Sequence, residues 1–390
     1  MTTVRKVLQR GLVAAAIMVL LILVFYSLAH AQVRIVNIPC GQDIDATINA
    51  DPRSTASRFV LGADCPFVAS ATIVPSDGDE VACEVAPTFV QRGPAFDPTT
   101  RCTVAGEASV EKVFSPRGQG GRVATVRFEG IKITGGNFAG QAGTGVGIAA
   151  GSMSPSSVTY GVEVGDNDGA GISNCNGTFE RIELSNTTQD PRALGFIGSG
   201  IKCVNESVIK NSYVHDNQGN GIWCDEECND TSLGTFLVQD NLVVDNGGAG
   251  IRWEKVGGAN AGEAIIENNE VRGNSIDAQR GGISVRDAQD AIIRNNSFGG
   301  NGREAAIIAA DSGSSDRPNL SNIVIVNNTL KGEDIKGCEL ANTVVACAGN
   351  TPCGREHCRP RLRTSDNAPS RCFGWAHHLN RLFLPLLPRR

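Results

Sequence analysis

The segment Asn211-Ser-Tyr-Val-His-Asp-Asn217, with the Gly221-Ile222 step that follows it, decides the fold of this chain. Its pattern is Asn or Asp, two residues, an apolar residue, two residues and Asn. Further copies begin at Asp240, Asn268, Asn295 and, in a weaker form, Asn327, so the five starting points are 29, 28, 27 and 32 residues apart. The second half recurs as a Gly-Ile step at Gly171, Gly200, Gly221, Gly250 and Gly282, and as Ala306-Ile307.

A repeat of this length predicts short parallel strands that stack from coil to coil. Alternate residues of a strand point to opposite faces, so the apolar residue of each copy would fill the interior. Gly before Ile is expected to allow the unusual backbone of a tight corner, and Asn at the turns tolerates left-handed geometry and can bond its equivalent one coil away. Coincidental turns in a β-sandwich are the alternative, which the near-constant spacing disfavours. The predicted fold is all-β, a single right-handed parallel β-helix.

The N-terminal segment has the features of an export signal. A basic start is followed by an uncharged apolar stretch from Gly11 to Leu28 and by the small-x-small site Ala29-His30-Ala31. We expect cleavage after Ala31, with residues 1–31 as the signal peptide and a secreted, periplasmic or cell-surface protein as the result. An uncleaved membrane anchor is the alternative, because the apolar run is near the lower limit for a span.

The mature chain divides by pattern into three parts. Residues 32–122 are expected to hold an N-terminal cap and the first coils, and residues 42–50 predict a short amphipathic helix that covers the open end of the stack. Residues 123–347 would be the β-helix repeats. Residues 348–390 lose strand periodicity and are rich in Cys and Arg, which predicts a disordered or loosely packed tail.

Thirteen cysteines in an exported chain predict disulfides, with one cysteine left over. Partners close in sequence are Cys40 with Cys65, Cys83 with Cys102 and Cys338 with Cys347. Cys203 and Cys224 share one position of adjacent coils, which favours an inward coil-to-coil disulfide or a stack of buried thiols. A small loop closed by Cys224 and Cys228 competes with that pairing.

The charge of the body disfavours nucleic acid as a partner. Residues 32–353 hold 24 Lys and Arg against 39 Asp and Glu, a net charge of −15. A local basic groove remains compatible with this balance. We expect no stable membrane insertion after signal cleavage, and a monomer.

The helical segment at residues 42–50 and the Asn and Gly-Ile coils together resemble the pectate-lyase-like right-handed β-helix superfamily, in particular its divergent bacterial repeat proteins. The resemblance covers roughly residues 38–346 and implies the fold. That superfold carries lyases, hydrolases, epimerases, esterases and tailspikes, so it does not imply one activity. The chain has no Arg-x-Pro-x-x-Arg, no Asp-Asp with Gly-His-Gly and no Asp-Pro-His-Asp. No catalytic residue of the family can therefore be carried over.

In such enzymes the substrate lies in a groove on the outer face of a stack of strands. If the Ile after each Gly points inward, the residues two and four after the Gly point outward, and coils about 4.8 Å apart place them in one patch. The patch comprises Lys202, Trp223, Asp225, Arg252, Glu254 and Arg286.

The residue types of this patch predict an acidic polysaccharide, such as a uronate polymer, as the partner. Lys202, Trp223, Arg252 and Arg286 would bind it, because Trp offers a face for sugar stacking and cations bind carboxylates. Asp225 and Glu254 would act as acid and base, or ligate Ca²⁺ with Glu226 and Glu227; no other cofactor is expected.

Several alternatives stay open at this point. Mixed charges on an outward column also suit a purely solvated face, and Trp223 would then be covered by the loop between Cys224 and Cys228. The chain would either be an enzyme, namely a polysaccharide lyase or a glycoside hydrolase, or a non-catalytic surface protein that binds glycans or proteins. His215 is expected to be solvated in a turn, which disfavours histidine chemistry in the body.

Overall fold

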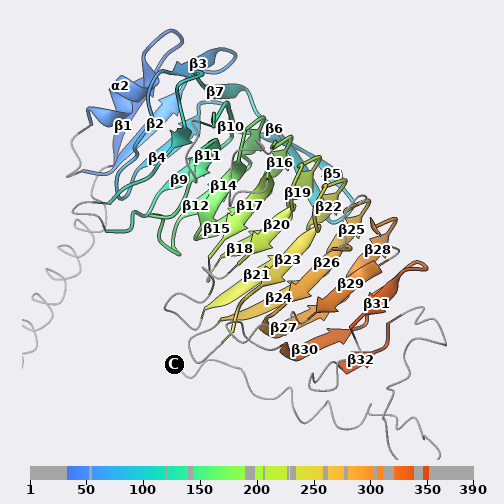
Figure 1. Ribbon diagram of the computed structural model, residues 1–390. Coiled ribbons are helices and arrows are strands. Elements are labelled where there is room, and N and C mark those ends of the chain that lie inside the picture. The colour runs from blue at the N-terminus through green and yellow to red at the C-terminus, as the bar shows by residue number, and fades with distance from the viewer. Residues whose placement is uncertain are drawn as a thin grey trace, which may run out of the picture. The chain divides into compact units, whose positions relative to one another are not determined.

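A computed structural model describes residues 33–51, 55–118, 122–138, 144–188, 198–204, 207–225, 228, 234–257, 262–275, 280–302, 305–310, 320–337 and 346–350. They belong to one compact unit, residues 1–358. Three long parallel sheets wind around a common apolar core, and from β9 to β28 each coil contributes one strand to each sheet (Figure 1). The predicted all-β parallel solenoid is thereby confirmed. The expected signal segment and the tail from residue 351 lie outside the described residues.

The three sheets are named A, B and C in the order in which a coil visits them. Sheet A comprises β1 (Arg34–Ile38), β2 (Ser57–Leu61), β4 (Glu80–Cys83), β9 (Arg127–Glu129), β12 (Val158–Tyr160), β15 (Thr178–Glu180), β18 (Val208–Lys210), β21 (Thr235–Gln239), β24 (Glu263–Glu267), β27 (Gln289–Arg294), β30 (Ser321–Val326) and β32 (Ala346–Ala348). Sheet B comprises β3 (Pro66–Ala69), β7 (Cys102–Gly106), β10 (Ile131–Thr134), β13 (Glu163–Gly165), β16 (Glu183–Ser185), β19 (Tyr213–His215), β22 (Leu242–Val244), β25 (Glu270–Arg272) and β28 (Ser297–Gly299). Sheet C comprises β8 (Lys112–Phe114), β11 (Val146–Ala149), β14 (Ala170–Cys175), β17 (Ser199–Cys203), β20 (Ile222–Cys224), β23 (Ile251–Glu254), β26 (Ile283–Arg286), β29 (Ala305–Ala310) and β31 (Asp334–Lys336).

The repeat predicts the core correctly. The apolar residue of each copy lies on sheet B and stacks on its equivalent in the next coil, as in the fully buried series Val214, Val243, Val271 and Phe298. The Ile of each Gly-Ile step does the same on sheet C, in the series Ile172, Ile201, Ile222, Ile251, Ile283 and Ile307.

At each corner between sheets A and B, two neighbouring residues divide the two roles that we expected of one Asn, namely the left-handed backbone and the hydrogen bond to the next coil. The first residue of each copy is left-handed, with φ of 53° at Asn211 and 54° at Asp240. The residue after it forms the ladder between sheets A and B, because the amide of Asn241 donates to Asn269 Oδ1 at 3.0 Å. The same bond repeats along Asn269, Asn296, Asn328 and Asn350.

A second ladder fills the corner between sheets B and C. The Nδ2 of Asn217 donates to Asn246 Oδ1 at 2.9 Å, and the series continues through Asn274 to Asn301. Its last acceptor is the buried carboxyl of Glu333, which takes two donors from Asn301. Each bond contributes about 1 kcal/mol net, and leaving one of these buried groups unpaired would cost more.

The glycine of each Gly-Ile step is required by packing and not, as expected, by an unusual backbone. These glycines are absent from the positive-φ residues. A Cβ on Gly221 would lie 2.7 Å from the Gly250 carbonyl oxygen, 2.9 Å from Asn246 Nδ2 and 2.9 Å from Val243 Cγ1. The ladder amide and the inward Val of the next coil thus leave no room for a side chain.

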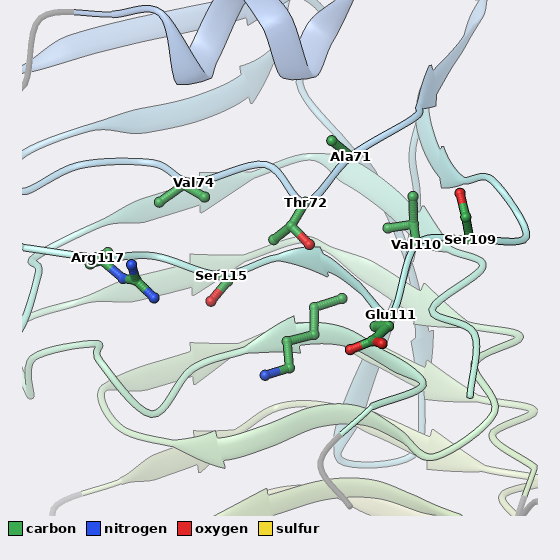
Figure 2. Close-up of a pocket in the computed structure, with 9 residues that line it drawn as sticks. Ala71, Thr72, Val74, Ser109, Val110, Glu111, Ser115 and Arg117 are labelled. Atoms are coloured by element: carbon green, nitrogen blue, oxygen red, sulfur yellow. The ribbon is translucent and has the colours of Figure 1, made fainter. Parts of the chain in front are cut away.

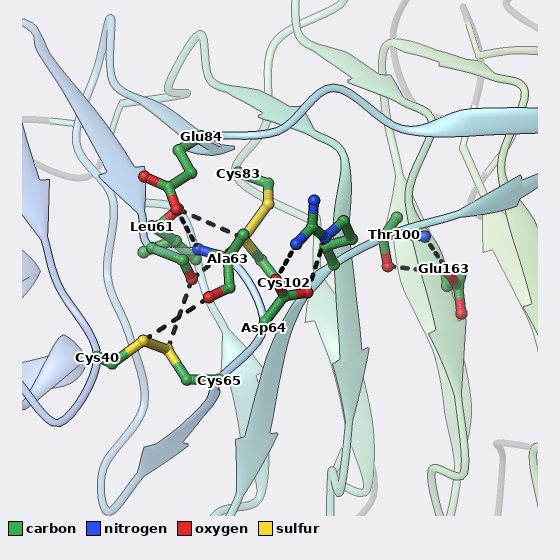
Figure 3. The surroundings of a disulfide bond; sticks show 12 residues. Cys40, Leu61, Ala63, Asp64, Cys65, Cys83, Glu84, Thr100, Cys102 and Glu163 are labelled. Atoms are coloured by element: carbon green, nitrogen blue, oxygen red, sulfur yellow. Dashed lines mark hydrogen bonds and ion pairs between the residues drawn. A yellow bond between two sulfur atoms is a disulfide. The ribbon is translucent and has the colours of Figure 1, made fainter.

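The N-terminal end is closed by the predicted short helix, α2 (Ile44–Asn49), whose Ile44 and Ile48 are buried. Two expected disulfides, Cys40–Cys65 and Cys83–Cys102, staple the first coils below it (Figure 3). Disulfides of this kind are typical of a chain that folds in an oxidising compartment. Among the described residues, no helix is long and apolar enough to cross a membrane.

The inward cysteines pair differently from the expectation. Cys203 does stack on Cys224, but it is bonded to Cys175 of the preceding coil, and Cys224 closes the small loop with Cys228. The competing pairing is therefore the correct one. Cys338 and the side chain of Cys347 lie outside the described part.

An antiparallel hairpin, β5 (Thr88–Arg92) and β6 (Ala95–Thr99), was not predicted. It runs along the corner of sheets A and B over several coils (Figure 1). The guanidinium of Arg181 lies 4.4 Å from the Phe96 ring centroid and 5.2 Å from that of Phe89, which fastens the hairpin by cation–π contacts.

His215 is not solvated, contrary to expectation. It lies in β19 beside the hairpin and hydrogen-bonds Glu183 Oε1 at 3.0 Å and Asp216 Oδ2 at 2.6 Å. Burial disfavours its charged form, but the carboxylates of Glu183 and Asp216 outweigh burial and raise the pKa of His215 above its usual value.

We predict that Gly221→Ala lowers the free energy of unfolding by about 1–3 kcal/mol, because the added methyl overpacks the ladder corner. The measurement is urea denaturation followed by circular dichroism. Gly299→Ala is the matched control, since its Cβ would meet only the end of Lys331 at 3.6 Å. Equal losses in the two variants would show that packing at the corner is not the cause.

We predict that Glu333→Gln stabilises the protein at neutral pH. Burial raises the pKa of Glu333 above 4.5, whereas hydrogen bonds from Asn301 oppose the rise. The folded state therefore holds the proton more tightly than the unfolded state, and stability falls as the pH rises from 4.5 through the folded pKa. Gln removes this loss, because its side chain does not ionise. Thermal melts at several pH values test this, and an advantage of Gln that is largest in acid would disprove it.

Candidate functional site

The six residues of the predicted patch all lie on the outer face of sheet C. Lys202, Trp223, Arg252 and Ser284 are register partners on successive strands from β17 to β26. Glu254 and Arg286 are register partners on β23 and β26, two residues after Arg252 and Ser284. Their inward neighbours, such as Cys203 and Trp253, belong to the core. The coil count from the sequence thus placed this face correctly.

Five of the six side chains are buried, which the sequence did not predict. Lys202, Trp223, Asp225, Arg252 and Glu254 are each at most 6% exposed, and only Arg286 reaches the surface. The expectation of an open, solvated face is therefore wrong for these five residues. Burial of Trp223 agrees with the alternative in which that ring is covered.

Ion pairs join the buried charges. The ammonium of Lys202 lies 3.6 Å from Asp225 Oδ2, and that of Lys255 lies 3.4 Å from Asp225 Oδ1. Arg252 pairs with Glu254 on its own strand. Because a buried charge without a partner is costly, these pairs make the cluster tolerable in a dry environment.

The Trp223 ring lies between two cations. Lys202 Nζ is 4.6 Å from its centroid on one coil, and the Arg252 guanidinium carbon is 5.4 Å away on the other. Sugar stacking on this ring would compete with both cations. The position of Trp223 therefore suits hydrogen bonding through its indole N–H better than stacking.

Three buried polar atoms of the cluster have no hydrogen-bond partner within the described part of the chain. They are the donors Trp223 Nε1 and Arg252 Nε and the acceptor Asp225 Oδ1. The contact of Asp225 Oδ1 with Lys255 is within ion-pair distance but lacks hydrogen-bond geometry. Unpaired donors of this kind are expensive unless a water or ligand group meets them.

The positive charge of Arg252 is opposed by its burial and by a neighbouring cation. Burial lowers its pKa, the Glu254 carboxylate opposes that shift, and the nearby Arg280 adds to it. Arginine keeps its charge even so. The cluster therefore holds a surplus of positive charge inside an acidic chain.

The candidate acids do not suit a Ca²⁺ site. Asp225 and Glu254 already face lysine and arginine partners, which would repel a cation. Among the described residues, no group of three His, Cys, Asp or Glu side chains could hold a metal ion together. Glu226 and Glu227, named as further ligands, lie outside the described residues.

A pocket at the N-terminal end of sheet C was missed by the sequence reasoning. It has a volume of about 460 Å³ and is lined by Ala71, Thr72, Val74, Ser109, Val110, Glu111, Lys112, Ser115 and Arg117. Figure 2 shows Thr72, Ser115 and Glu111 around it. The segment at Ile73 pairs with Phe114 of β8, so this is an early coil of sheet C. These coils lack the Asn repeat, which is why the outward columns could not be counted this far.

We predict that Arg252→Met lowers the free energy of unfolding by about 3–5 kcal/mol, because it leaves Glu254 buried without a partner. The second change Glu254→Gln should restore most of the loss. Arg272→Met, at the exposed pair with Glu270 on sheet B, is the control and should cost less than about 1 kcal/mol. Chemical denaturation measures all of these variants, and equal losses for Arg252 and Arg272 would show that the cluster is solvated.

No curated protein matches the sequence. Solved structures to which this chain is similar include the A-module of a mannuronan C-5 epimerase of Azotobacter vinelandii, with 17% identity over 79% of this chain and 89% of that chain and a TM-score of 0.44. Pectate lyase Pel9A has 13% identity over 83% and 82%, with a TM-score of 0.47. Protein ORF18 of Geobacillus virus E2 has 10% identity over 81% and 60%, with a TM-score of 0.48. These likenesses say nothing of activity.

A family model gives the more direct result. The model described as the right handed beta helix region matches residues 199–351, which include the Asn ladders and the buried cluster. The resemblance suggested by the repeats is confirmed for this part. Residues 199–351 are thus a right-handed β-helix region, and the three sheets that pass through it continue N-terminally to β1, β3 and β8.

Proposed function

We propose that the outer face of sheet C binds an anionic polysaccharide outside the cytoplasm. The observation that carries this proposal is the pair of buried, unpaired donors, Trp223 Nε1 and Arg252 Nε, among surplus cations. Both donors are buried, so a carboxylate or sulfate would have to displace the groups that cover them; it could then accept their hydrogen bonds and balance the charge. The disulfides and the expected signal segment favour a secreted, periplasmic or cell-surface location.

Further cations extend this face in both directions. Lys112 and Arg117 line the pocket at one end, and Arg286 is exposed toward the other. Six strand spacings separate β8 from β26, which is about 29 Å. The cations form two groups, since β11 and β14 between them carry none. A polymer with several anionic groups can reach both groups, whereas a single small anion cannot.

Catalysis by this face would rest on Asp225 and Glu254. In a lyase or hydrolase one of them would act as base or acid. Both carboxylates are buried and already paired with cations, and these contacts disfavour catalysis. Binding without cleavage is therefore the first candidate function, and cleavage of the bound polymer is the second.

We predict saturable binding of a uronate polymer, with a change in tryptophan fluorescence, and no binding of an uncharged polysaccharide of the same length. Arg286→Gln and Arg117→Gln, which alter exposed groups, should each weaken binding about three- to tenfold. Arg272→Gln on sheet B is the matched control and should leave the affinity unchanged.

Absorbance of unsaturated products at the ultraviolet edge detects a lyase, and new reducing ends without that absorbance detect a hydrolase. Product that disappears in Asp225→Asn and Glu254→Gln supports an enzyme, and binding without product supports a binding protein. Equal affinity for charged and uncharged polymers would overturn the proposal for this face.

A further inference from the structure

The outer face of sheet A carries an apolar stripe that no other described element covers. Its residues sit at one register position of seven successive strands and are each partly exposed. Six of the seven are aliphatic. In strand order from β12 to β30 they are Val158, Thr178, Val208, Leu237, Ile265, Ile292 and Val324.

A charged column runs beside this stripe, two residues further along each strand. From β15 to β27 it reads Glu180, Lys210, Gln239, Glu267 and Arg294. Neighbours in the column are ion-paired, with 3.1 Å between Lys210 Nζ and Glu180 and 2.6 Å between Arg294 Nε and Glu267. The column is therefore neutral as a whole.

If the order of the coils is reversed about Gln239, each charge of the column is matched with a charge of the opposite sign. One coil away from Gln239, Lys210 mirrors Glu267, and two coils away Glu180 mirrors Arg294. The apolar stripe has the same centre, because Val208 mirrors Ile265 and Val158 mirrors Val324 around Leu237. A surface that is complementary to its own inverted copy is the requirement for an isologous dimer.

We propose that sheet A is a self-association surface, on which a second copy of this chain packs face to face with its β-helix axis antiparallel. The two-fold axis would lie along β21, at Leu237 and Gln239. A rotation about the strand direction keeps each column opposite itself and reverses its coil order. Lys210 then faces Glu267 of the second copy, and Glu180 faces Arg294 of the second copy.

Other symmetries and partners fit less well. A two-fold axis along the β-helix axis would place each coil opposite the same coil, which loses the inverted match of the charges. An anionic polymer finds no surplus of cations on this column. Two sheets packed face to face would lie about 10 Å apart, which suits the interdigitation of Val, Leu and Ile side chains.

The size of the stripe predicts a weak dimer. Six strand spacings give a length of about 29 Å, and a strand of five residues gives a width of about 17 Å. The face is then about 500 Å² per subunit, below the roughly 800 Å² of a standard stable interface. Association should therefore depend on concentration, which departs from the monomer expected from the sequence.

Sedimentation equilibrium of the full mature chain over a concentration series tests this proposal. The wild type should show a reversible monomer–dimer equilibrium. Lys210→Glu and Glu267→Lys should each weaken it about tenfold, because each reversal spoils two symmetric contacts. The double variant Lys210→Glu/Glu267→Lys should restore the affinity to within about threefold, since the reversed charges attract each other again across the dimer.

Two further variants test whether association occurs through sheet A. Leu237→Lys places two ammonium groups at the two-fold axis and should abolish the dimer, with unchanged circular dichroism as the check on folding. Arg272→Glu, on sheet B, is the matched charge control and should leave the equilibrium unchanged. A chain that stays monomeric, or a double variant that is no better than the single ones, would overturn the proposal. Polysaccharide binding by sheet C is measured separately and would be unaffected by any of these outcomes.

Discussion

The hydrogen bond from one ladder asparagine to the next is the interaction on which the rest of this structure depends. Asn246 occupies the corner of sheets B and C, receives the Asn217 amide and passes its own to Asn274. Its side chain fills the space in which the Cβ of Gly221 would otherwise lie. The ladder therefore sets how closely the coils approach, and its amides require glycine before the Ile of β17, β20, β23 and β26. This constraint holds successive strands in register and lines up the outward side chains that form the candidate site.

Periodic features could be predicted from the sequence, because each coil repeats the same local contacts. The inward series through Val243 and Ile222, the ladders and the outward position of Trp223 all follow from counting residues. Features that occur once could not be counted. The hairpin of β5 and β6 belongs to no repeat, and the pairing of Cys203 with Cys175 depends on a local shift of register in β14. The positions of the glycines were predicted correctly, but the reason was not. We expected an unusual backbone, whereas the structure shows close contacts with side chains of the next coil.

For the candidate site too, counting residues along the repeat predicts some features and misses others. The alternation of side chains along a strand predicts which face of the sheet a side chain occupies, but it does not predict whether other residues cover that face. Lys202 and Arg252 point outward as predicted and are nevertheless buried. The resulting chemistry differs from that of an open patch. The cost of burial makes each unpaired N–H matter more, so Trp223 becomes informative through its indole donor and not through its ring face.

The three outer faces have different electrostatic characters, and on this difference we base the different partners that we propose for them. Sheet B is partly occupied by the hairpin, where Ala95 packs on Leu242 and Val244. Sheet C holds more cations than anions and leaves donors unpaired, which calls for an anion from outside the chain. On sheet A each cation of the column already has its acid, and six of the seven residues of the neighbouring stripe are aliphatic. Such a stripe gains little from a charged polymer but gains free energy from an equally apolar surface. The ladder register that aligns the cations of sheet C also aligns the stripe of sheet A, so the same repeat accounts for both of the faces for which we propose a partner.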